Sequence, residues 1–132
     1  GKAEVFLQVV FIKDYFSLLK IRFENAVQLN INIQEEMFDK FLIPPISLQA
    51  LIENAIKHNE FSDASPLVIT IKLEGEDLIV HNKNNKRSGR KQSSKIGVQN
   101  LNERYKLTTD KTIQVQDDGK DFIVRLPVLR MS

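Results

Sequence analysis

The chain has 132 residues, a length that suits one domain able to bury a core without disulfides or a structural metal. It contains no cysteine, which excludes thiolate metal sites, and its two histidines are too few for a histidine-based zinc site without carboxylate ligands. A net charge of +2 is too small to indicate nucleic-acid binding by itself. No apolar run reaches the roughly 18 residues of a membrane span, and no signal peptide is visible. Because Gly1 stands in place of an initiator methionine, we expect a fragment of a longer protein.

The first half of the chain predicts a helix, a strand and a second helix in turn. Apolar residues recur at spacings of three and four over residues 4–23, which is the helical period, and further apolar residues there allow two faces to be buried. Strict alternation over residues 27–33 predicts a half-buried strand. Residues 34–41 favour a short helix, and a longer one is expected over residues 45–58, since proline is tolerated in a first helical turn.

The second half predicts two hairpins separated by a helix. Residues 67–73 and 77–82 alternate on either side of Glu74-Gly75-Glu76 and are expected to pair. Residues 83–95 are polar, basic and aperiodic, which predicts a flexible loop. A helix is expected over 96–107, followed by strands 113–115 and 122–126 around Asp118-Gly119. This order, without repeats or a second domain, predicts an α+β fold, a two-layer sandwich with helices gathered on one face of the sheet.

The polar face of the helix around residues 48–59 is the main candidate site. Its apolar stripe is formed by Leu48, Leu51, Ile52 and Ala55. The opposite face carries a carboxylate, a carboxamide, a cation and an imidazole within two turns: Glu53, Asn54, Lys57 and His58. Such a set can hold a metal–phosphate group, because oxygen ligands suit Mg²⁺ and lysine suits phosphate. An ordinary solvated surface would show the same division, so the pattern alone leaves both interpretations open.

Three segments carry a resemblance to a known family. Residues 48–59 (LQALIENAIKHN), preceded by Ile43-Pro44-Pro45, resemble the N box of the LytS-type sensor histidine kinases, which belong to the GHKL group of gyrase, Hsp90, histidine kinase and MutL ATPases. Residues 11–16 and 21–23 resemble the segment that joins the dimerisation helices to the ATP domain. Residues 96–105 resemble the second glycine box and the helix after it. The resemblance covers nearly the whole chain.

This resemblance implies the C-terminal ATP-binding (HATPase) domain of such a kinase. The implied fold is the Bergerat-type sandwich, with a mixed, mostly antiparallel sheet. The implied organisation is a helical connector over residues 1–24 and an ATP-binding catalytic domain over residues 25–132. Residues 83–95 correspond to the lid that closes over ATP. That basic stretch could also be a plain solvated loop or a polyanion-binding surface, although no aromatic platform is interleaved with it.

The family's residue roles carry over by position. The resemblance makes Asn54 the ligand of a Mg²⁺ ion that bridges the nucleotide phosphates, places Lys57 near those phosphates, and makes His58 a lining residue of the nucleotide pocket. It gives Glu53 a catalytic role beside Asn54, that of polarising the attacking imidazole. Gly97 is expected where backbone N–H groups at a helix start approach phosphate. The implied nucleotide-binding set is completed at the lid and second glycine box by Asn82, Lys95 and Asn100.

The chain departs from the family pattern at three of its positions. Asn82 stands where the family has the aspartate that accepts a hydrogen bond from adenine, and Asn84 stands where it has a glycine two residues later. The carboxamide of Asn82 keeps an acceptor but lacks the charge that strengthens the bond. Lys95 replaces the first glycine of Gly-x-Gly, although its ammonium could point at a phosphate. These departures favour an alternative function, a degenerate, non-catalytic GHKL interaction module with weak or no ATP binding.

The leading hypothesis is the catalytic fragment of a protein-histidine kinase of a bacterial two-component system. It would bind ATP and Mg²⁺ and transfer the γ-phosphate to a histidine outside this chain, since His58 lies in the N box and His81 on a strand. The resemblance implies two partners: the dimerisation and phosphoacceptor helices of the same protein, and a response regulator that often carries a LytTR domain. It implies no direct contact with nucleic acid. It also implies a membrane-anchored homodimer as the parent, with this domain on the cytoplasmic side of the inner membrane.

Overall fold

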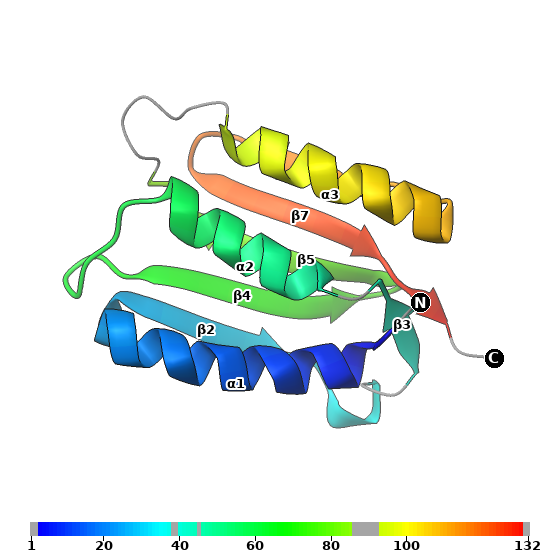
Figure 1. Cartoon of the computed structure of the whole chain (residues 1–132), viewed down its shortest axis with the longest axis horizontal. Helices are drawn as coiled ribbons and strands as arrows, with labels where there is room; N and C mark the ends of the chain where they lie inside the picture. Colours follow the sequence, from blue (N-terminus) through cyan, green and yellow to red (C-terminus); the bar gives the residue numbers. More distant parts are fainter. Residues whose placement is uncertain (1–2, 38–39, 45, 86–92, 131–132) are drawn as a thin grey trace.

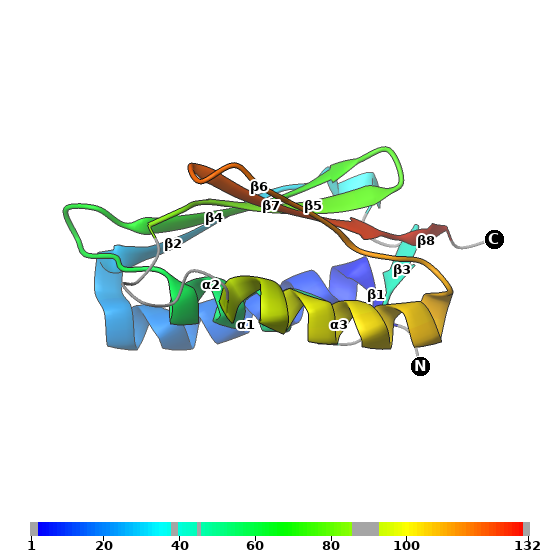
Figure 2. The ribbon, with the colours of Figure 1, turned by 90° about the horizontal axis from the view of Figure 1, so that it is seen from above.

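The computed structural model describes residues 3–37, 40–44, 46–85 and 93–130, without the side chains of residues 3–12, 35 and 93–96. Two layers make up the molecule, a twisted sheet and a row of three helices on one of its faces (Figures 1 and 2). The α+β two-layer sandwich expected from the sequence is thereby confirmed.

The helices are α1 (Val5–Phe23), α2 (Ser47–His58) and α3 (Ser93–Thr109), with 3₁₀ turns at Glu24–Ala26 and Glu35–Met37. The main sheet contains five strands: β2 (Val27–Asn32), β4 (Leu67–Glu74), β5 (Asp77–Lys83), β6 (Gln114–Asp117) and β7 (Asp121–Pro127). A small second sheet contains three short strands: β1 (Ala3–Glu4), β3 (Phe41–Ile43) and β8 (Leu129–Arg130).

The main sheet has the strand order β2-β4-β5-β7-β6. Strands β2 and β4 pair in parallel, whereas the other three pairs are antiparallel, so the expected mixed and mostly antiparallel sheet is also confirmed. At one end of the central strand β5, Asn82 pairs in register with Ile69 of β4 and Phe122 of β7. The next-to-last residue of the central strand is therefore a polar residue between two apolar ones.

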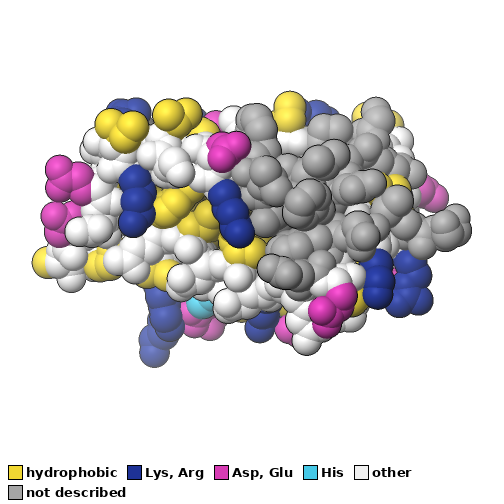
Figure 3. Space-filling model, turned by 90° about the horizontal axis from the view of Figure 1, so that it is seen from below, with side chains coloured by type: hydrophobic (Ala, Val, Ile, Leu, Met, Phe, Trp, Pro, Cys, Tyr) yellow, Lys and Arg dark blue, Asp and Glu magenta, His cyan; other side chains and the backbone are white. Residues whose placement is uncertain are grey.

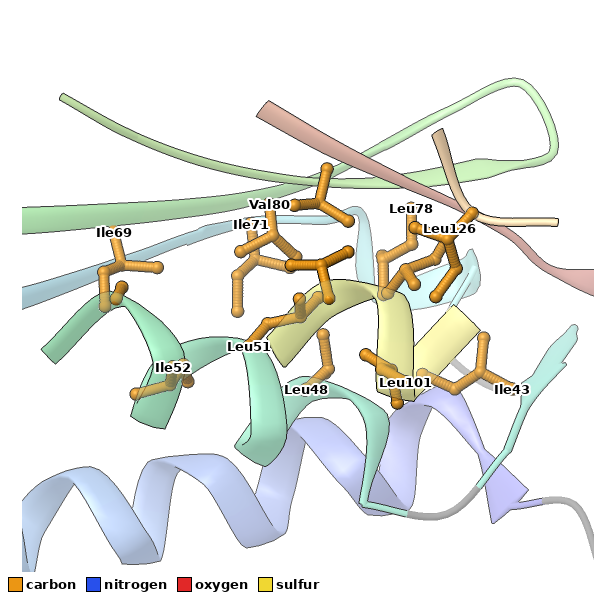
Figure 4. Close-up of a cluster of buried hydrophobic side chains, with 14 of the residues drawn as sticks. Ile43, Leu48, Leu51, Ile52, Ile69, Ile71, Leu78, Val80, Leu101 and Leu126 are labelled. Atoms are coloured by element: carbon orange, nitrogen blue, oxygen red, sulfur yellow. The ribbon is translucent and has the colours of Figure 1, made fainter. Parts of the chain in front are cut away.

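The core lies between the sheet and α2, which runs between α1 and α3 (Figure 1). Alternate residues of β4, β5 and β7 point toward the helices, where they meet the apolar stripes of α2 and α3 (Figure 4). Full burial of a valine, leucine or isoleucine side chain stabilises the fold by roughly 1.5–3 kcal/mol. Nine residues carry the largest fully buried side chains: Tyr105, Phe41, Ile43, Leu48, Ile52, Ile69, Ile71, Leu78 and Leu126.

Helix α1 is apolar on more than one side, as its sequence indicates. Tyr15 and Leu19 pack against the core, whereas Leu18 and Ile21 are exposed to solvent. Figure 3 views this side of the molecule and shows apolar and basic side chains interspersed on it. Within the described ranges, no helix combines the length and the apolar character needed to cross a bilayer.

Two sequence-based boundaries were wrong. Of residues 34–37, 40 and 41, which the structure describes, only Glu35–Met37 are helical, as a 3₁₀ turn, and Phe41 begins β3 because this short apolar run pairs with β1 and β8. The expected loop over 83–95 is shorter at both ends, since Lys83 belongs to β5 and α3 begins at Ser93 rather than Ile96. The remaining loop prediction falls on residues 86–92, which lie outside the described residues.

Candidate functional site

Two residues on the polar face of α2 contact different neighbouring helices: Glu53 contacts α1, and Asn54 contacts α3. The exposed carboxylate of Glu53 accepts hydrogen bonds from the Tyr15 hydroxyl of α1 and from the Gln49 side chain, both at 3.1 Å from Oε1. Burial, and then the Glu53 charge, raises the pKa of Tyr15, so the phenol stays a hydrogen-bond donor. Glu53 is therefore held toward α1, and Tyr15 is a partner that the sequence did not reveal.

Asn54, the next residue, contacts α3 instead. A Cβ atom added to Gly97 would lie 2.5 Å from Asn54 Oδ1 and 3.4 Å from its Cγ, closer than real side chains approach. Gly97 is helical without a positive φ, so a side chain here would be limited by space rather than by the backbone, and the Asn54 carboxamide would have to move. The structure thus brings together Asn54 and Gly97, two residues that are far apart in the sequence and were both singled out from it.

Gly97 lies one turn inside α3, which differs from the expected place at a helix start. The first N–H groups of a helix lack acceptors within it, and in α3 these include the N–H groups of residues 93–95. Free donors and the positive end of the helix dipole therefore lie just before Gly97. The expected contribution of Lys95 depends on its side chain, which lies outside the described residues.

Asn82 lies on the helix-facing side of β5, in a row with Ile69 and Phe122, and its side chain is 3% exposed. Its Nδ2 donates to the backbone oxygen of Lys83 at 2.9 Å, which fixes the orientation of the carboxamide. Among the described residues, none donates a hydrogen bond to Asn82 Oδ1. A buried acceptor left without any donor costs about 1–3 kcal/mol, and the expected role of Asn82 in nucleotide binding stays a prediction.

The other expected site residues differ in exposure. Lys57 and Asn100 are exposed on α2 and α3, whereas His58 is buried, with 4% of its surface exposed. The lid expected over ATP stays a prediction, because it includes residues 86–92, which lie outside the described residues. The expected roles of Lys57, His58 and Asn100 in nucleotide binding remain predictions.

A hydrogen-bonded bridge at the end of α2 was missed from the sequence. Buried Asn59 donates from Nδ2 to the Ala55 carbonyl oxygen at 2.9 Å and accepts at Oδ1 from the Asn85 N–H at 2.8 Å. Glu60 N–H donates to the Asn85 carbonyl at 2.8 Å, and Asn85 Nδ2 donates to the Glu60 carbonyl at 2.9 Å. An asparagine directly after a helical stretch was the available signal, since that residue type caps helices.

Asn84, which precedes Asn85 in the chain, is hydrogen-bonded to residues around the β6–β7 turn. Asn84 N–H donates to the Lys120 carbonyl at 2.7 Å, and Asn84 Nδ2 donates to Asp117 Oδ1 at 2.7 Å. Asp117 Oδ1 also accepts from the Gly119 N–H at 3.1 Å. The chain that leaves β5 is therefore tied to α2 through Asn85 and to the β6–β7 turn through Asn84.

The outer face of β5 carries a second polar cluster, which is internally paired. His81 Nε2 lies 2.7 Å from Asp121 Oδ1, and Lys83 Nζ lies 3.1 Å from the same oxygen. The hydrogen bond to His81, and then the one to Lys83, lowers the pKa of Asp121. These groups face away from the helices and satisfy one another.

Known proteins with similar sequences are sensor kinases. No protein-family model matches the chain. The sensor histidine kinase BtsS of Escherichia coli K12 is 31% identical over 80 residues, which are 59% of this chain and 14% of BtsS. The sensor histidine kinase/phosphatase LytS of Staphylococcus aureus N315 is 40% identical over 47 residues, 36% of this chain and 8% of LytS. The matches thus span only a small part of these relatives.

Solved structures with a similar fold are histidine kinases as well. The catalytic domain of histidine kinase ThkA superimposes with a TM-score of 0.59 at 11% identity, covering 96% of this chain and 95% of the ThkA chain. Histidine kinase AdeS of Acinetobacter baumannii gives a TM-score of 0.57 at 13% identity and covers 96% of this chain and 67% of AdeS. At such identities the likeness establishes the fold.

Proposed function

We propose, from the premise that this chain is related to the LytS-type sensor histidine kinases and has the fold of their ATP-binding domain, that it binds Mg²⁺–ATP between α2, α3 and β5. The observation that carries the proposal is the contact of the Asn54 carboxamide with Gly97. It brings an oxygen ligand of the kind that Mg²⁺ prefers next to the amino-terminal turn of α3. Helix amino termini favour phosphate, because their free N–H groups and dipole attract anions.

The base of the nucleotide would lie toward Asn82. Because Asn82 Nδ2 is engaged by the Lys83 carbonyl, the side chain offers its oxygen to a ligand. A buried acceptor discriminates strongly in favour of a base edge that presents a donor, such as the amino group of adenine. We therefore assign adenine recognition to Asn82 and phosphate and metal binding to Asn54, Lys57 and the start of α3.

Phosphoryl transfer from such a site depends on positioning and on charge stabilisation. Mg²⁺, when bound, would neutralise part of the negative charge of the phosphates. Asn54 would fix the phosphates, and the exposed Lys57 would add a positive charge near them. Glu53, held by Tyr15 and Gln49, would accept a hydrogen bond from the attacking imidazole of a histidine outside this chain.

The assignment extends to the parent protein. We propose that its dimerisation helices carry the phosphoacceptor histidine and that a response regulator, of the LytTR type, receives the phosphate. We also propose a membrane-anchored homodimer with this domain on the cytoplasmic side. These proposals rest on the resemblance to the LytS-type kinases, and the sensor histidine kinases among the chain's relatives support the coarser assignment to a two-component system.

A second candidate function is favoured by the chemistry of two positions. The neutral carboxamide of Asn82 and the lysine at position 95 each remove a feature that strengthens nucleotide binding in the family. On this alternative the domain keeps the fold, binds ATP weakly or not at all, and acts by docking against partner helices.

Calorimetric titration of Mg²⁺–ATP into the chain separates the two functions. We expect saturable binding to the wild type and at least a tenfold higher Kd for Asn54→Ala, about 1.4 kcal/mol. Asn30→Ala, on the exposed face of edge strand β2, is the matched control and should leave the Kd unchanged. Absence of wild-type binding at millimolar ATP would instead support the docking module.

A further inference from the structure

The two sides of the proposed site belong to different elements. Asn54 and His58 lie on α2, whereas Asn82 lies on β5, and the β4 hairpin strand separates them in the chain. A nucleotide that contacts both sides gains full affinity only if the distance between them is already fixed. The apolar core fixes that distance in the middle of α2, so its end needs a separate link.

Asn59 supplies a link of suitable chemistry. A carboxamide offers both a donor and an acceptor, and Asn59 uses each: Nδ2 caps the Ala55 carbonyl, and Oδ1 receives the Asn85 N–H. The Ala55 carbonyl belongs to the last turn of α2, so this bond holds the side chain of Asn59 against the end of the helix. The same side chain thus terminates the helix and holds the continuation of β5.

The bridge lies close to both sides of the site. Asn85 follows Asn82 by three residues, roughly 10 Å along an extended chain. Asn59 follows Asn54 by five residues, roughly 7.5 Å along a helix axis, and directly follows His58. Reciprocal hydrogen bonds between Asn85 and Glu60 hold the same two segments together, so the contact resists rotation as well as separation.

We propose that Asn59 is a positioning residue for the nucleotide: with Asn85, it sets the separation between α2 and the end of β5, and hence between Asn54 and Asn82. This inference rests on the proposed function, because it assigns to the bridge a role in Mg²⁺–ATP binding. Asn59 does not contact the nucleotide on this account, and its effect on affinity passes through the two elements it joins.

A variant of a comparable asparagine, Asn102, serves as a control that distinguishes a positioning role of Asn59 from a general contribution to stability. Asn102 of α3 accepts a hydrogen bond at Oδ1 from the Ile113 N–H at 2.7 Å, which joins a helix to the chain just before a strand, as Asn59 does. That link leads toward edge strand β6 and joins no pair of proposed site residues. Both Asn59→Ala and Asn102→Ala should therefore lower the melting temperature, whereas only the first should change nucleotide affinity.

The experiment is calorimetric titration of Mg²⁺–ATP into the wild type, Asn59→Ala and Asn102→Ala, with melting temperatures measured alongside. We expect about a tenfold higher Kd for Asn59→Ala and less than a twofold change for Asn102→Ala. Asn85→Ala removes only the bond to the Glu60 carbonyl and serves as the milder variant should Asn59→Ala fail to fold. We expect a two- to threefold higher Kd for it.

The possible failures are distinguishable. If the wild type binds ATP and the Asn59 and Asn85 variants bind it as tightly, positioning is refuted while the proposed function stands. An equal rise in Kd for Asn102→Ala would reduce the effect to general destabilisation and also refute positioning. A wild type that does not bind ATP would overturn the proposed function and this inference together.

Discussion

Two adjacent residues of β5 show how the two faces of the sheet differ. His81 points to the outer face, where Asp121 lies 2.7 Å from its Nε2 and in turn pairs with Lys83. Asn82 points to the helices and is almost fully buried, yet its Oδ1 receives no hydrogen bond from the described residues. The outer groups are partly solvated and pair with one another, whereas the inner residue is desolvated and has an oxygen to which none of the described residues donates.

This difference agrees with the proposal that a ligand acts on the inner side of the strand. A polar group whose partners are all in the protein stabilises the fold modestly, and at a solvated surface its net effect is small. A buried polar group with an unused acceptor weakens the fold unless a ligand supplies the donor. The predictions below change each face in turn and ask whether stability and nucleotide affinity respond separately, as this comparison requires.

The largest effect is expected on the helix side, from Gly97→Ala. The new Cβ would displace the Asn54 carboxamide, so Mg²⁺–ATP affinity should fall more than tenfold, about 2 kcal/mol. Stability should change little, because replacing glycine inside a helix gains about 1 kcal/mol, which offsets the displacement of Asn54. Calorimetry and thermal melts measure the two quantities.

Gly75→Ala is the matched control for this change. Gly75 lies in the β4–β5 turn with a φ of 61° and open space around its Cβ position. Alanine there should cost about 1 kcal/mol of stability through backbone strain and leave the Kd unchanged. Unchanged affinity in Gly97→Ala would show that the contact between α2 and α3 has no part in nucleotide binding.

A smaller and opposite pair of effects is expected from Asn82→Leu. Leucine has the same number of side-chain heavy atoms and the same branching as asparagine and matches the apolar neighbours Ile69 and Phe122, so it should raise the unfolding free energy by about 1 kcal/mol. The same change removes the acceptor and should weaken ATP binding about tenfold, by 1.4 kcal/mol. Urea unfolding and calorimetry report on each. A destabilised Asn82→Leu variant would mean that the carboxamide serves the fold.

Much of the fold could be predicted because its longer elements have clear periods. The alternation over residues 27–33 and 67–73 and the stripe of α2 are enforced by burial on one side, and the observed strands and helix follow them within a few residues. The small sheet could not be predicted, since β1, β3 and β8 are two or three residues long and gain their structure from partners distant in sequence. The early start of α3 was missed for a related reason, as Ser93, Ser94 and Lys95 show no apolar period.

The candidate site, like the fold, could be predicted from the sequence only in part. Residue types and spacing on one helix indicated a polar face that includes Asn54, and the family resemblance assigned the role of Asn54 and added Gly97 and Asn82. The contact of Asn54 with Gly97 and the unsatisfied oxygen of Asn82 depend on how elements pack, which no local pattern encodes. The bridge from Asn59 to Asn85 joins residues 26 positions apart and was invisible for that reason.

The smallest effect is expected on the outer face, from Asp121→Asn. Hydrogen bonds from His81 and Lys83 lower the pKa of Asp121 in the folded state below its unfolded value of about 3.9. A carboxyl group with a lowered folded pKa contributes stability above the unfolded pKa and loses that contribution as the pH falls through the folded pKa. The variant should therefore melt below the wild type at pH 7, and the two melting temperatures should converge as the pH falls below about 4.

The same variant should leave the Kd for Mg²⁺–ATP unchanged at pH 7, because the cluster lies on the face of β5 opposite Asn82. Salt should shrink the difference in melting temperature, since Lys83 is largely exposed and its attraction to Asp121 is screened. A difference that persists unchanged at pH 2.5 would assign it to lost packing or to the amide itself. A tenfold change in Kd would mean that the two faces of β5 are coupled, and would remove the distinction between a self-satisfied outer cluster and an inner residue that needs a ligand.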